Sequence, residues 1–357
     1  MADRKKKNPN KGANQGSRRI THSDIAKALG VSQMTISLAL RNHPRISEAT
    51  RNRVHAKAAE LNYHPDPMLS ALSSYRLSNQ KKIRQATLAW INPFRDPAHL
   101  RIQHEFDLYW KGACEAANHF GFHLEEFTTS TLSLARMNTI FKTRNIQGIV
   151  LASLGGANLT GDWEKFPWQD YMAVRFGLST DYPQVHRITS SQVRNTYIAF
   201  NKIVEKGYQR IGFCGHRSPT RFFSAGFAFA QYSLPDLCRI PPLFFMENMS
   251  KAQQIDHLKC WMKTTRPDAI LTERPAIPEM LRELGYTIPG DVALATLSLH
   301  DTPINAGIDQ NPEEIGRAAV RTVTSLLNEQ SFGIPSIQKE TLIDGKWMDG
   351  SMLPDKA

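Results

Sequence analysis

The chain has 357 residues, of which 41% are apolar and 22% charged, so it can build two or three globular domains. Its net charge of +11 is confined to the first quarter. Residues 1–85 contain 17 Lys and Arg against five Asp and Glu, whereas residues 86–357 contain 27 against 28. A basic module joined to a neutral body is typical of nucleic-acid-binding proteins. A basic face for an anionic membrane surface is the alternative. No apolar stretch approaches the roughly 20 residues of a membrane span, so no such span is expected.

The four cysteines, Cys114, Cys214, Cys238 and Cys260, are scattered without the spacing of metal ligands. We interpret them as reduced, mostly buried thiols. Lys5–Lys7 are followed by polar residues and not by the apolar segment of a secretory signal. These features predict a cytoplasmic protein that uses no cofactor and does not enter a membrane.

Residues 1–19 are rich in Asn, Gly and Lys and contain almost no apolar side chains, which predicts a disordered basic arm. The arm either contacts phosphates or is only a solvated tail. From residue 20 to residue 64 the pattern changes to three short amphipathic helices. In the first of them, Thr21 is the predicted N-cap in a capping box with Asp24, and Gly30 ends the helix.

Ser32 is the predicted N-cap of the second helix and Ser47 that of the third. A Gly-Val-Ser turn joins the first two helices. The apolar residues that recur on one face of each helix are Ile25 and Leu29, then Ile36, Ala39 and Leu40, then Val54, Ala58 and Leu61. Their faces predict one small core, and therefore a compact trihelical domain over residues 20–64.

Residues 65–85 read as a hinge or linker. Pro65 and Pro67 prevent the third helix from continuing, and residues 68–72 can form at most one short helical turn.

Residues 86–353 alternate between strands and helices. The expected strands are QATLAWI, FHLEEFTT, IQGIVLASL, YMAVRFGL, RIGFCG, LFFME, DAILT and DVALATLS, and the expected helices between and after them include residues 222–233 and 312–328. The strands are continuously apolar, which is typical of parallel sheets covered by helices on both faces. The length of this region predicts an α/β body of two lobes.

An enzyme is one alternative, because two α/β lobes often enclose an active site. The sequence has no GxGxxG after the first strand, no P-loop, no G-x-S-x-G elbow, no HExxH and no Cys-x-x-Cys. His99, His104, Glu105 and Asp107 have the composition of a metal site but not the spacing of ligands on one helix face. We therefore predict no catalytic residues and no metal site.

The segment THSDIAKALGVSQMTISLALRNHPRISEATRNRVHAKAAELNYHPDPMLSAL resembles the DNA-binding head of the LacI/GalR family of regulators. It carries D-I-A at 24–26, G-V-S at 30–32, T-I-S at 35–37 and L-N-Y-x-P at 61–65. EKGYQRIGFCG, RPDAILT, LGYTIPGDVALATLS and GIDQNPEEIGRAAV resemble the family's body. The resemblance implies a helix-turn-helix head and a periplasmic-binding-protein-like body of two Rossmann-like lobes. It also implies a homodimeric regulator, most often a repressor, that binds a near-palindromic DNA operator.

The resemblance places the second helix in the major groove, where its N-terminal residues read base edges. The base-reading residues implied are Ser32, Gln33, Met34, Thr35 and Ser37. The Gln33 amide suits an adenine and the Met34 side chain suits a thymine methyl group, with core packing as the alternative role of Met34. Leu38 departs from the family, which often has Arg at this position.

Phosphate contacts are implied for Thr21, Arg41, Arg45, Ser47, Thr50 and Arg51. Leu72 matches the apolar wedge that relatives insert into the minor groove at the operator centre. The pair Asp66-Pro67 departs from the more basic hinge of the family, so the wedge is a hypothesis.

The effector pocket of the family is matched by Phe94, Arg175, Arg221, Phe223 and Thr272. Phe223 stands where sugar-binding relatives have Arg, and residues 296–299 read Thr-Leu-Ser-Leu where they have Asp. The run at 189–191, Thr-Ser-Ser, replaces another Asp. A sugar-like or unusual small molecule is therefore favoured over an ordinary free sugar, with a protein co-regulator or no effector as alternatives.

Three other functions stay open from the sequence alone. A ligand-binding protein of transport would have no use for a basic trihelical head. An enzyme with an accessory DNA-binding head would turn over a small metabolite, and an architectural protein would bind random and selected DNA equally well.

Overall fold

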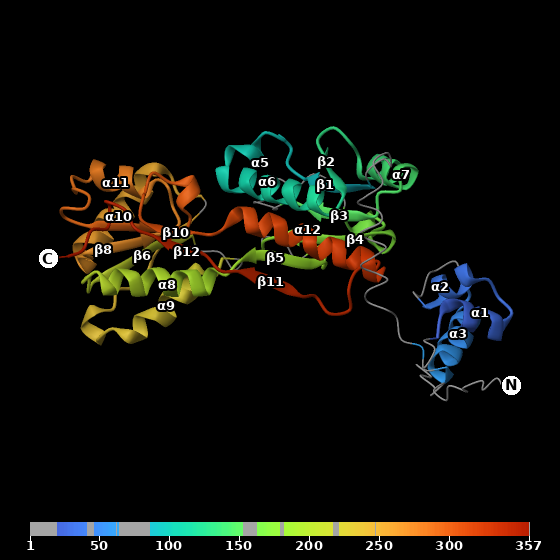
Figure 1. Ribbon diagram of the computed structural model, residues 1–357. Coiled ribbons are helices and arrows are strands. Elements are labelled where there is room, and N and C mark those ends of the chain that lie inside the picture. The colour runs from blue at the N-terminus through green and yellow to red at the C-terminus, as the bar shows by residue number, and fades with distance from the viewer. Residues whose placement is uncertain are drawn as a thin grey trace, which may run out of the picture. The chain divides into compact units, whose positions relative to one another are not determined.

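In the computed structural model the chain forms two compact units, residues 1–79 and 80–357 (Figure 1). The structure describes residues 20–40, 46–61, 63, 86–152, 163–178, 182–216, 221–246 and 248–356. Helices and strands carry the labels of Figure 1.

The described part of the first unit forms three helices, α1 (His22–Leu29), α2 (Gln33–Leu40) and α3 (Glu48–Glu60). The capping box predicted for α1 is confirmed, because the backbone amide and the hydroxyl of Thr21 both donate to the Asp24 carboxylate, at 2.9 and 2.7 Å. Gly30 adopts φ 68°, a left-handed conformation that ends the helix and that favours glycine.

The predicted faces of the three helices meet in one core. Its buried members are Ile25, Ala26, Ile36, Ala39, Val54 and Ala58, and Leu29, Leu40 and Leu61 pack against them. Tyr63 connects the segment after α3 to the start of α1, because the Tyr63 hydroxyl lies 2.8 Å from Nε2 of His22. The trihelical head is thus built on contacts that lie within residues 20–63.

The second unit contains two six-stranded sheets, which define two lobes. The first sheet has the order β11-β5-β4-β3-β1-β2, with all neighbours parallel. Its strands are β1 (Ala86–Asn92), β2 (Phe122–Thr128), β3 (Gly148–Leu151), β4 (Met172–Phe176), β5 (His186–Ser190) and β11 (Glu340–Ile343). The predicted parallel sheet is therefore present in the first lobe.

The second sheet has the order β12-β10-β9-β8-β6-β7. Its strands are β6 (Ile211–His216), β7 (Leu243–Phe245), β8 (Ala269–Thr272), β9 (Ala293–Thr296), β10 (Gly307–Asp309) and β12 (Lys346–Met348). All neighbours are parallel except β12, which runs antiparallel to β10 at the edge.

Helices cover both sheets on both faces. In the first lobe, Leu88 and Trp90 face α6 (His104–His119) and α12 (Pro312–Glu329), while Ala89 and Ile91 face α7 (Leu134–Arg144) and two 3₁₀ turns, η1 (Trp163–Lys165) and η2 (Trp168–Asp170). In the second lobe, α8 (Gln192–Glu205) and α9 (Phe223–Ala230) cover one face, and α10 (Lys251–Thr265) and α11 (Ile277–Glu283) cover the other. A short helix, α5 (His99–Ile102), precedes α6.

The helices α6 and α12 lie in direct backbone contact, which two glycines permit. A Cβ atom on Gly112 would lie 1.9 Å from the carbonyl oxygen of Glu313, and one on Gly316 would lie 2.0 Å from that of Tyr109. No side chain fits at either position unless the helices move apart.

The chain passes between the lobes three times, after β5, after β10 and after β11 (Figure 1). Polar contacts join the three passages. The Asn195 side chain accepts from the amide of Gly345 at 2.7 Å, and the Asn311 side chain donates to the carbonyl oxygen of Asp344 at 2.7 Å. The connection between the two lobes, which is the hinge of the body, therefore consists of three chain segments joined by hydrogen bonds.

Some sequence expectations differ from the structure. The helix expected over residues 222–233 ends at Ala230, because Gln231–Ser233 tighten into a 3₁₀ turn, η3, which is followed by a second turn, η4 (Asp236–Cys238). The expectation of mostly buried thiols is wrong, since Cys214 is buried but Cys260 is exposed and the other two are half-buried. Within the described ranges, no helix has the length and apolar character of a membrane span.

Candidate DNA-binding surface and inter-lobe site

The start of α2 is an exposed surface. Gln33 and Met34 are both exposed, and Met34 retains 73% of its accessible area. Ile36 and Ala39, on the opposite face, are fully buried in the core of the head. The core-packing alternative for Met34 is therefore wrong. The start of α2 exposes the Gln33 amide and the Met34 thioether to solvent, where a partner can contact them.

Two further residues assigned to base reading also organise the helix. Ser32 accepts a hydrogen bond from the amide of Thr35 at 3.0 Å, and the two hydroxyls lie 2.9 Å apart. This hydrogen bond confirms the prediction that Ser32 is the N-cap of α2. Ser37, one turn later, is half-buried.

The hydroxyl residues assigned to phosphate lie at the beginnings of α1 and α3. Thr21 precedes α1, while Ser47 caps α3 and its hydroxyl lies 2.9 Å from that of Thr50. Amide groups at helix N-termini favour anions, so this placement suits a phosphate backbone. Arg51 is half-buried in the first turn of α3. Arg41, Arg45 and Leu72 lie outside the described residues.

Three of the five residues matched to the effector pocket are packed inside their own lobes. Phe94 belongs to the core of the first lobe and Phe223 to that of the second, each with 4% of its area exposed. The buried hydroxyl of Thr272 donates to the carbonyl oxygen of Cys214 at 2.8 Å and accepts from the amide of Arg274 at 3.0 Å. The contacts of these three side chains within the protein leave them little surface for a ligand.

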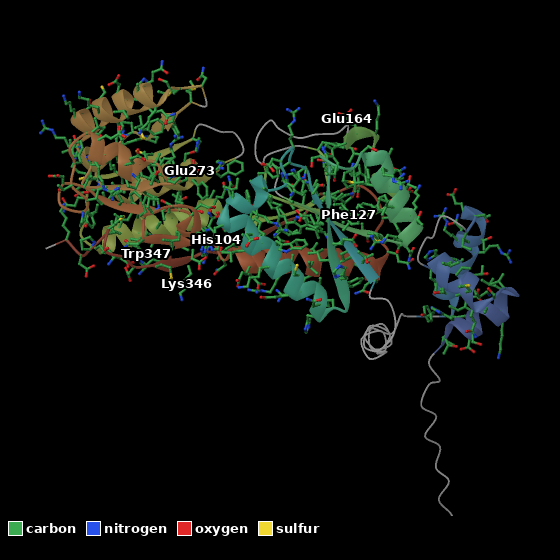
Figure 2. The ribbon with its side chains drawn as sticks, turned by 90° about the horizontal axis from the view of Figure 1, so that it is seen from above. His104, Phe127, Glu164, Glu273, Lys346 and Trp347 are labelled. Atoms are coloured by element: carbon green, nitrogen blue, oxygen red, sulfur yellow. The ribbon has the colours of Figure 1, made fainter. Side chains whose placement is uncertain are left out.

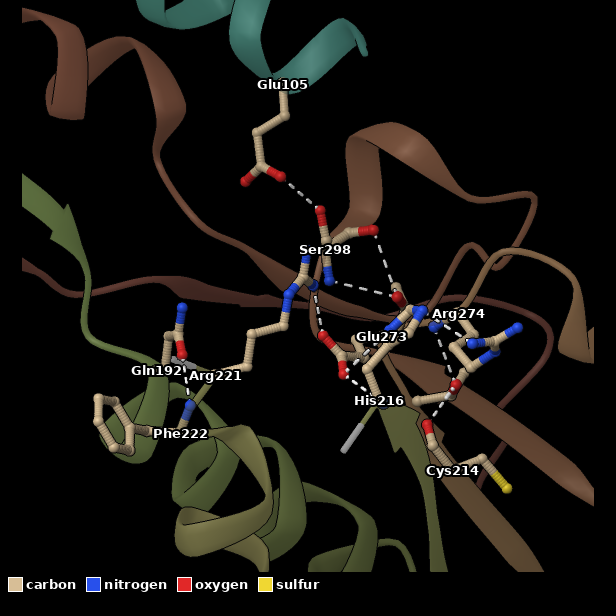
Figure 3. Close-up of polar contacts among 11 residues, drawn as sticks. Glu105, Gln192, Cys214, His216, Arg221, Phe222, Glu273, Arg274 and Ser298 are labelled. Atoms are coloured by element: carbon tan, nitrogen blue, oxygen red, sulfur yellow. Dashed lines mark hydrogen bonds and ion pairs between the residues drawn. The ribbon is translucent and has the colours of Figure 1, made fainter. Parts of the chain in front are cut away.

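The other two are arginines on different lobes. Arg175 is fully buried within β4 of the first lobe. Arg221 precedes α9 of the second lobe, is half-exposed, and donates to Oε2 of Glu273 at 2.6 Å (Figure 3). The structure therefore does not gather all five predicted residues into one cluster.

Glu273 forms the centre of a polar cluster at the ends of β6 and β8. Its Oε1 accepts from the amide of His216 at 2.8 Å. Burial alone would raise the pKa of Glu273, but hydrogen bonds from His216 and the charge of Arg221 lower it to about 2. Glu273 is therefore ionised, and it lies in the second lobe (Figure 2). The carboxyl ends of parallel strands are where open α/β sheets bind ligands.

Arg274 extends this cluster away from Glu273. Its guanidinium lies 4.6 Å from the centre of the Phe245 ring and donates to Oε1 of Gln254 at 2.9 Å. It also lies 2.8 Å from Nε2 of His216 (Figure 3). Burial lowers the pKa of Arg274, but its guanidinium remains a cation at neutral pH.

The first lobe contributes a carboxyl group that the sequence did not assign to the pocket. The hydroxyl of Ser298, which follows β9, donates to Oε2 of Glu105 in α6 at 2.7 Å (Figure 3). His104, beside Glu105, has its ring 5.7 Å from that of His300, at the place where the lobes meet (Figure 2). In the sequence, Glu105 stands out only as part of the histidine- and acid-rich run around His104, and Glu273 only as the residue that follows Thr272.

A trihelical head with an exposed second helix, followed by two α/β lobes with polar groups at their strand ends, defines a DNA-binding regulator with a ligand-binding body. Comparisons with known proteins agree. Residues 21–66 match the family described as bacterial regulatory proteins, lacI family, and residues 200–346 match the periplasmic binding protein-like domain.

Similar proteins extend over nearly the whole chain. The HTH-type transcriptional regulator MalR of Streptococcus pneumoniae is 24% identical over 327 residues, which are 87% of this chain and 93% of MalR. A transcriptional regulator CelR-cellobiose complex aligns with TM-score 0.55 and 18% identity over 94% of this chain and all of that one. The lac repressor dimer bound to operator and the anti-inducer ONPF aligns with TM-score 0.53 and 16% identity, over 94% of this chain and 100% of that one.

The chain belongs to the LacI family of transcriptional regulators, with a DNA-binding head and a periplasmic-binding-protein-like effector-binding body. This family consists of regulators and not of enzymes, in agreement with the absence of catalytic motifs from the sequence.

Proposed function

We propose that the protein is a homodimeric repressor that binds a near-palindromic DNA operator, with one α2 helix in the major groove of each half-site. The observation that carries the proposal is the exposed pair Gln33 and Met34 at the start of a helix whose other face is locked into the core. An exposed Met contributes little to the head's stability, but its apolar side chain suits a thymine methyl group. The lac repressor dimer, a protein of similar fold, is bound to its operator, which supports operator binding by a dimer.

In this proposal Ser32, Thr35 and Ser37 complete the base-reading surface. Thr21, Arg41, Arg45, Ser47, Thr50 and Arg51 contact phosphates and fix the register of the head on the duplex. Leu72 acts as the wedge in the minor groove at the operator centre. In this proposal the protein acts in the cytoplasm, where its DNA lies.

We further propose that a sugar-like small molecule binds between the lobes and changes operator affinity. The complex of CelR with cellobiose supports a sugar-like ligand for this fold. The candidate contact with an exposed side chain is Arg221, which pairs with Glu273 on the second lobe. The predicted Phe94, Arg175, Phe223 and Thr272 are buried in their own lobes, so we assign them a role in shaping the pocket. A coupling of about 1–3 kcal/mol is typical for such a transition.

The test is selection of random duplex DNA on the purified protein at physiological salt, followed by sequencing of the bound pool. The expected result is a near-palindrome whose two half-sites have centres one helical turn, about 10 bp, or a multiple of that apart. A pool without sequence preference would contradict the proposal and would favour the architectural alternative. Selection of a single half-site would contradict the dimer.

A further inference from the structure

A buried carboxyl group of the first lobe contacts the second lobe directly. Glu105 lies at the start of α6 in the first lobe, and its Oε2 accepts a hydrogen bond of 2.7 Å from Ser298 of the second lobe. The backbone amide of Glu105 also lies 3.4 Å from Oδ1 of Asp301, in the 3₁₀ turn η5 (Leu299–Asp301). Separation of the lobes at this point breaks both contacts, here called the Glu105 contact.

Glu105 is in an environment that disfavours its negative charge. Only 8% of its area is exposed, and its second oxygen, Oε1, is buried without a hydrogen-bond partner among the described residues. Burial raises the pKa of Glu105 to about 7, with a further contribution from the nearby Asp301 carboxylate. The Ser298 hydrogen bond and the charges of His300 and Arg221 act in the opposite direction but do not cancel the shift.

The groups around the contact come from several elements of both lobes. His104 and Tyr109 lie on α6 itself, and the buried Tyr109 hydroxyl has its own pKa raised by desolvation and by Glu105. From the second lobe, Nε2 of His300 lies 3.1 Å from Oδ1 of Asp309, the last residue of β10. The same Asp309 oxygen accepts from the amide of Asn311 in the hinge at 2.9 Å. The Glu105 contact is thus linked to the passage of the chain between the lobes.

We propose that Glu105 makes closure of the two lobes depend on proton concentration, because the closed lobes hold its neutral form and ionisation favours their separation. Glu105 is a positioning residue in this proposal: through its hydrogen bond with Ser298 it holds the two lobes together. Its effect on operator affinity rests on the proposed function, but its effect on the lobes does not.

The sign follows from the two states of the carboxyl. In open lobes Glu105 is solvated and has a pKa near the usual 4.5, whereas in closed lobes the value is about 7. Closure therefore takes up a proton. Its stabilisation is complete below pH 4.5, is lost progressively as the pH rises to about 7, and changes little above that. Between pH 5.5 and 7.5 the closing equilibrium should fall by about 20-fold.

The experiment is hydrogen exchange of the full-length protein, followed by mass spectrometry, on peptides that contain residues 104–109 and 298–302. After correction for intrinsic exchange rates, wild-type protection of both peptides should fall by about 20-fold from pH 5.5 to 7.5. In Glu105→Gln, whose side chain is neutral at every pH, protection should stay constant over this range. Ser298→Ala, in which the carboxyl remains, should lower protection at all pH values and keep the pH dependence.

Two controls separate Glu105 from its neighbours. Asp107→Asn removes an exposed carboxylate from the same helix, where it pairs with Arg101 at 3.0 Å, and should behave like wild type. A double variant, H104Q/H300Q, removes both imidazoles and should retain the pH dependence. An unchanged pH dependence in Glu105→Gln, or its loss in either control, would overturn the proposal.

The DNA arm of the test is separate. If the selected operator shows no pH-dependent affinity while the exchange data behave as expected, the proton dependence of the lobes stands and the link from lobes to head is contradicted. If no operator is found, the proposed function fails but the exchange result still decides the Glu105 contact.

Discussion

Replacement of Gln33 by Ala tests whether α2 reads bases. Because the Gln33 side chain is exposed and is not part of the core of the head, the free energy of unfolding should change by less than about 0.5 kcal/mol in this variant. A bidentate amide contact to adenine discriminates by about 1–3 kcal/mol, so the Kd for the selected operator should rise by about 5- to 150-fold per half-site. Fluorescence anisotropy with the operator and with all four bases at the assigned pair measures this loss.

The result that would refute this reasoning is an equal loss of affinity on operator and random DNA, since base readout predicts relaxed preference at one base pair. Ile36→Ala is the matched control on the same helix. Its side chain is fully buried in the core of the head, so the variant should lose about 2–5 kcal/mol of unfolding free energy. Met34→Ala should resemble Gln33→Ala, with unchanged stability and weaker preference for thymine.

Three more outcomes are expected. Arg51→Ala should weaken binding to all sequences alike and lower the slope of log K against log salt by about one, and an unchanged slope would remove Arg51 from the phosphate contacts. Gly316→Ala should cost about 1–3 kcal/mol in chemical denaturation, because its new methyl group would lie 2.0 Å from the Tyr109 carbonyl oxygen; wild-type stability would show that α12 and α6 separate freely. Leu72→Ala should reduce operator bending in a circular-permutation gel assay, and unaltered bending would end the wedge hypothesis.

Features encoded by neighbouring residues could be predicted from the sequence. The capping box of Thr21 and Asp24, the stop at Gly30 and the three apolar faces of the head all depend on residues at most one helix apart. The alternation of apolar strands and helices likewise predicted both lobes. By contrast, β5, β10, β11 and β12 were not among the expected elements. The last three are only three or four residues long, with β11 and β12 largely exposed, and β5 begins with the polar residues His186 and Arg187.

Contacts between distant segments could not be predicted in this way. The hydrogen bond of Glu105 to Ser298 joins residues 193 positions apart, and nothing in either local sequence indicates a partner. Thr272 is the last residue of β8 and Phe223 is the first residue of α9, but the burial of both depends on how the second lobe packs around them. The close approach of Gly112 and Gly316 is invisible for the same reason, since each lies in an ordinary helical pattern.

Because the chain passes between the lobes three times, the parts of the protein can complete their folding only in a fixed order during synthesis. The first sheet needs β11, whose Glu340 pairs with Arg187 of β5, so the ribosome must have made nearly the whole chain before this lobe is complete. The head has all its described contacts within residues 20–63 and can fold long before that. A nascent chain would therefore carry a finished DNA-binding head while both of its lobes still lack their last strands.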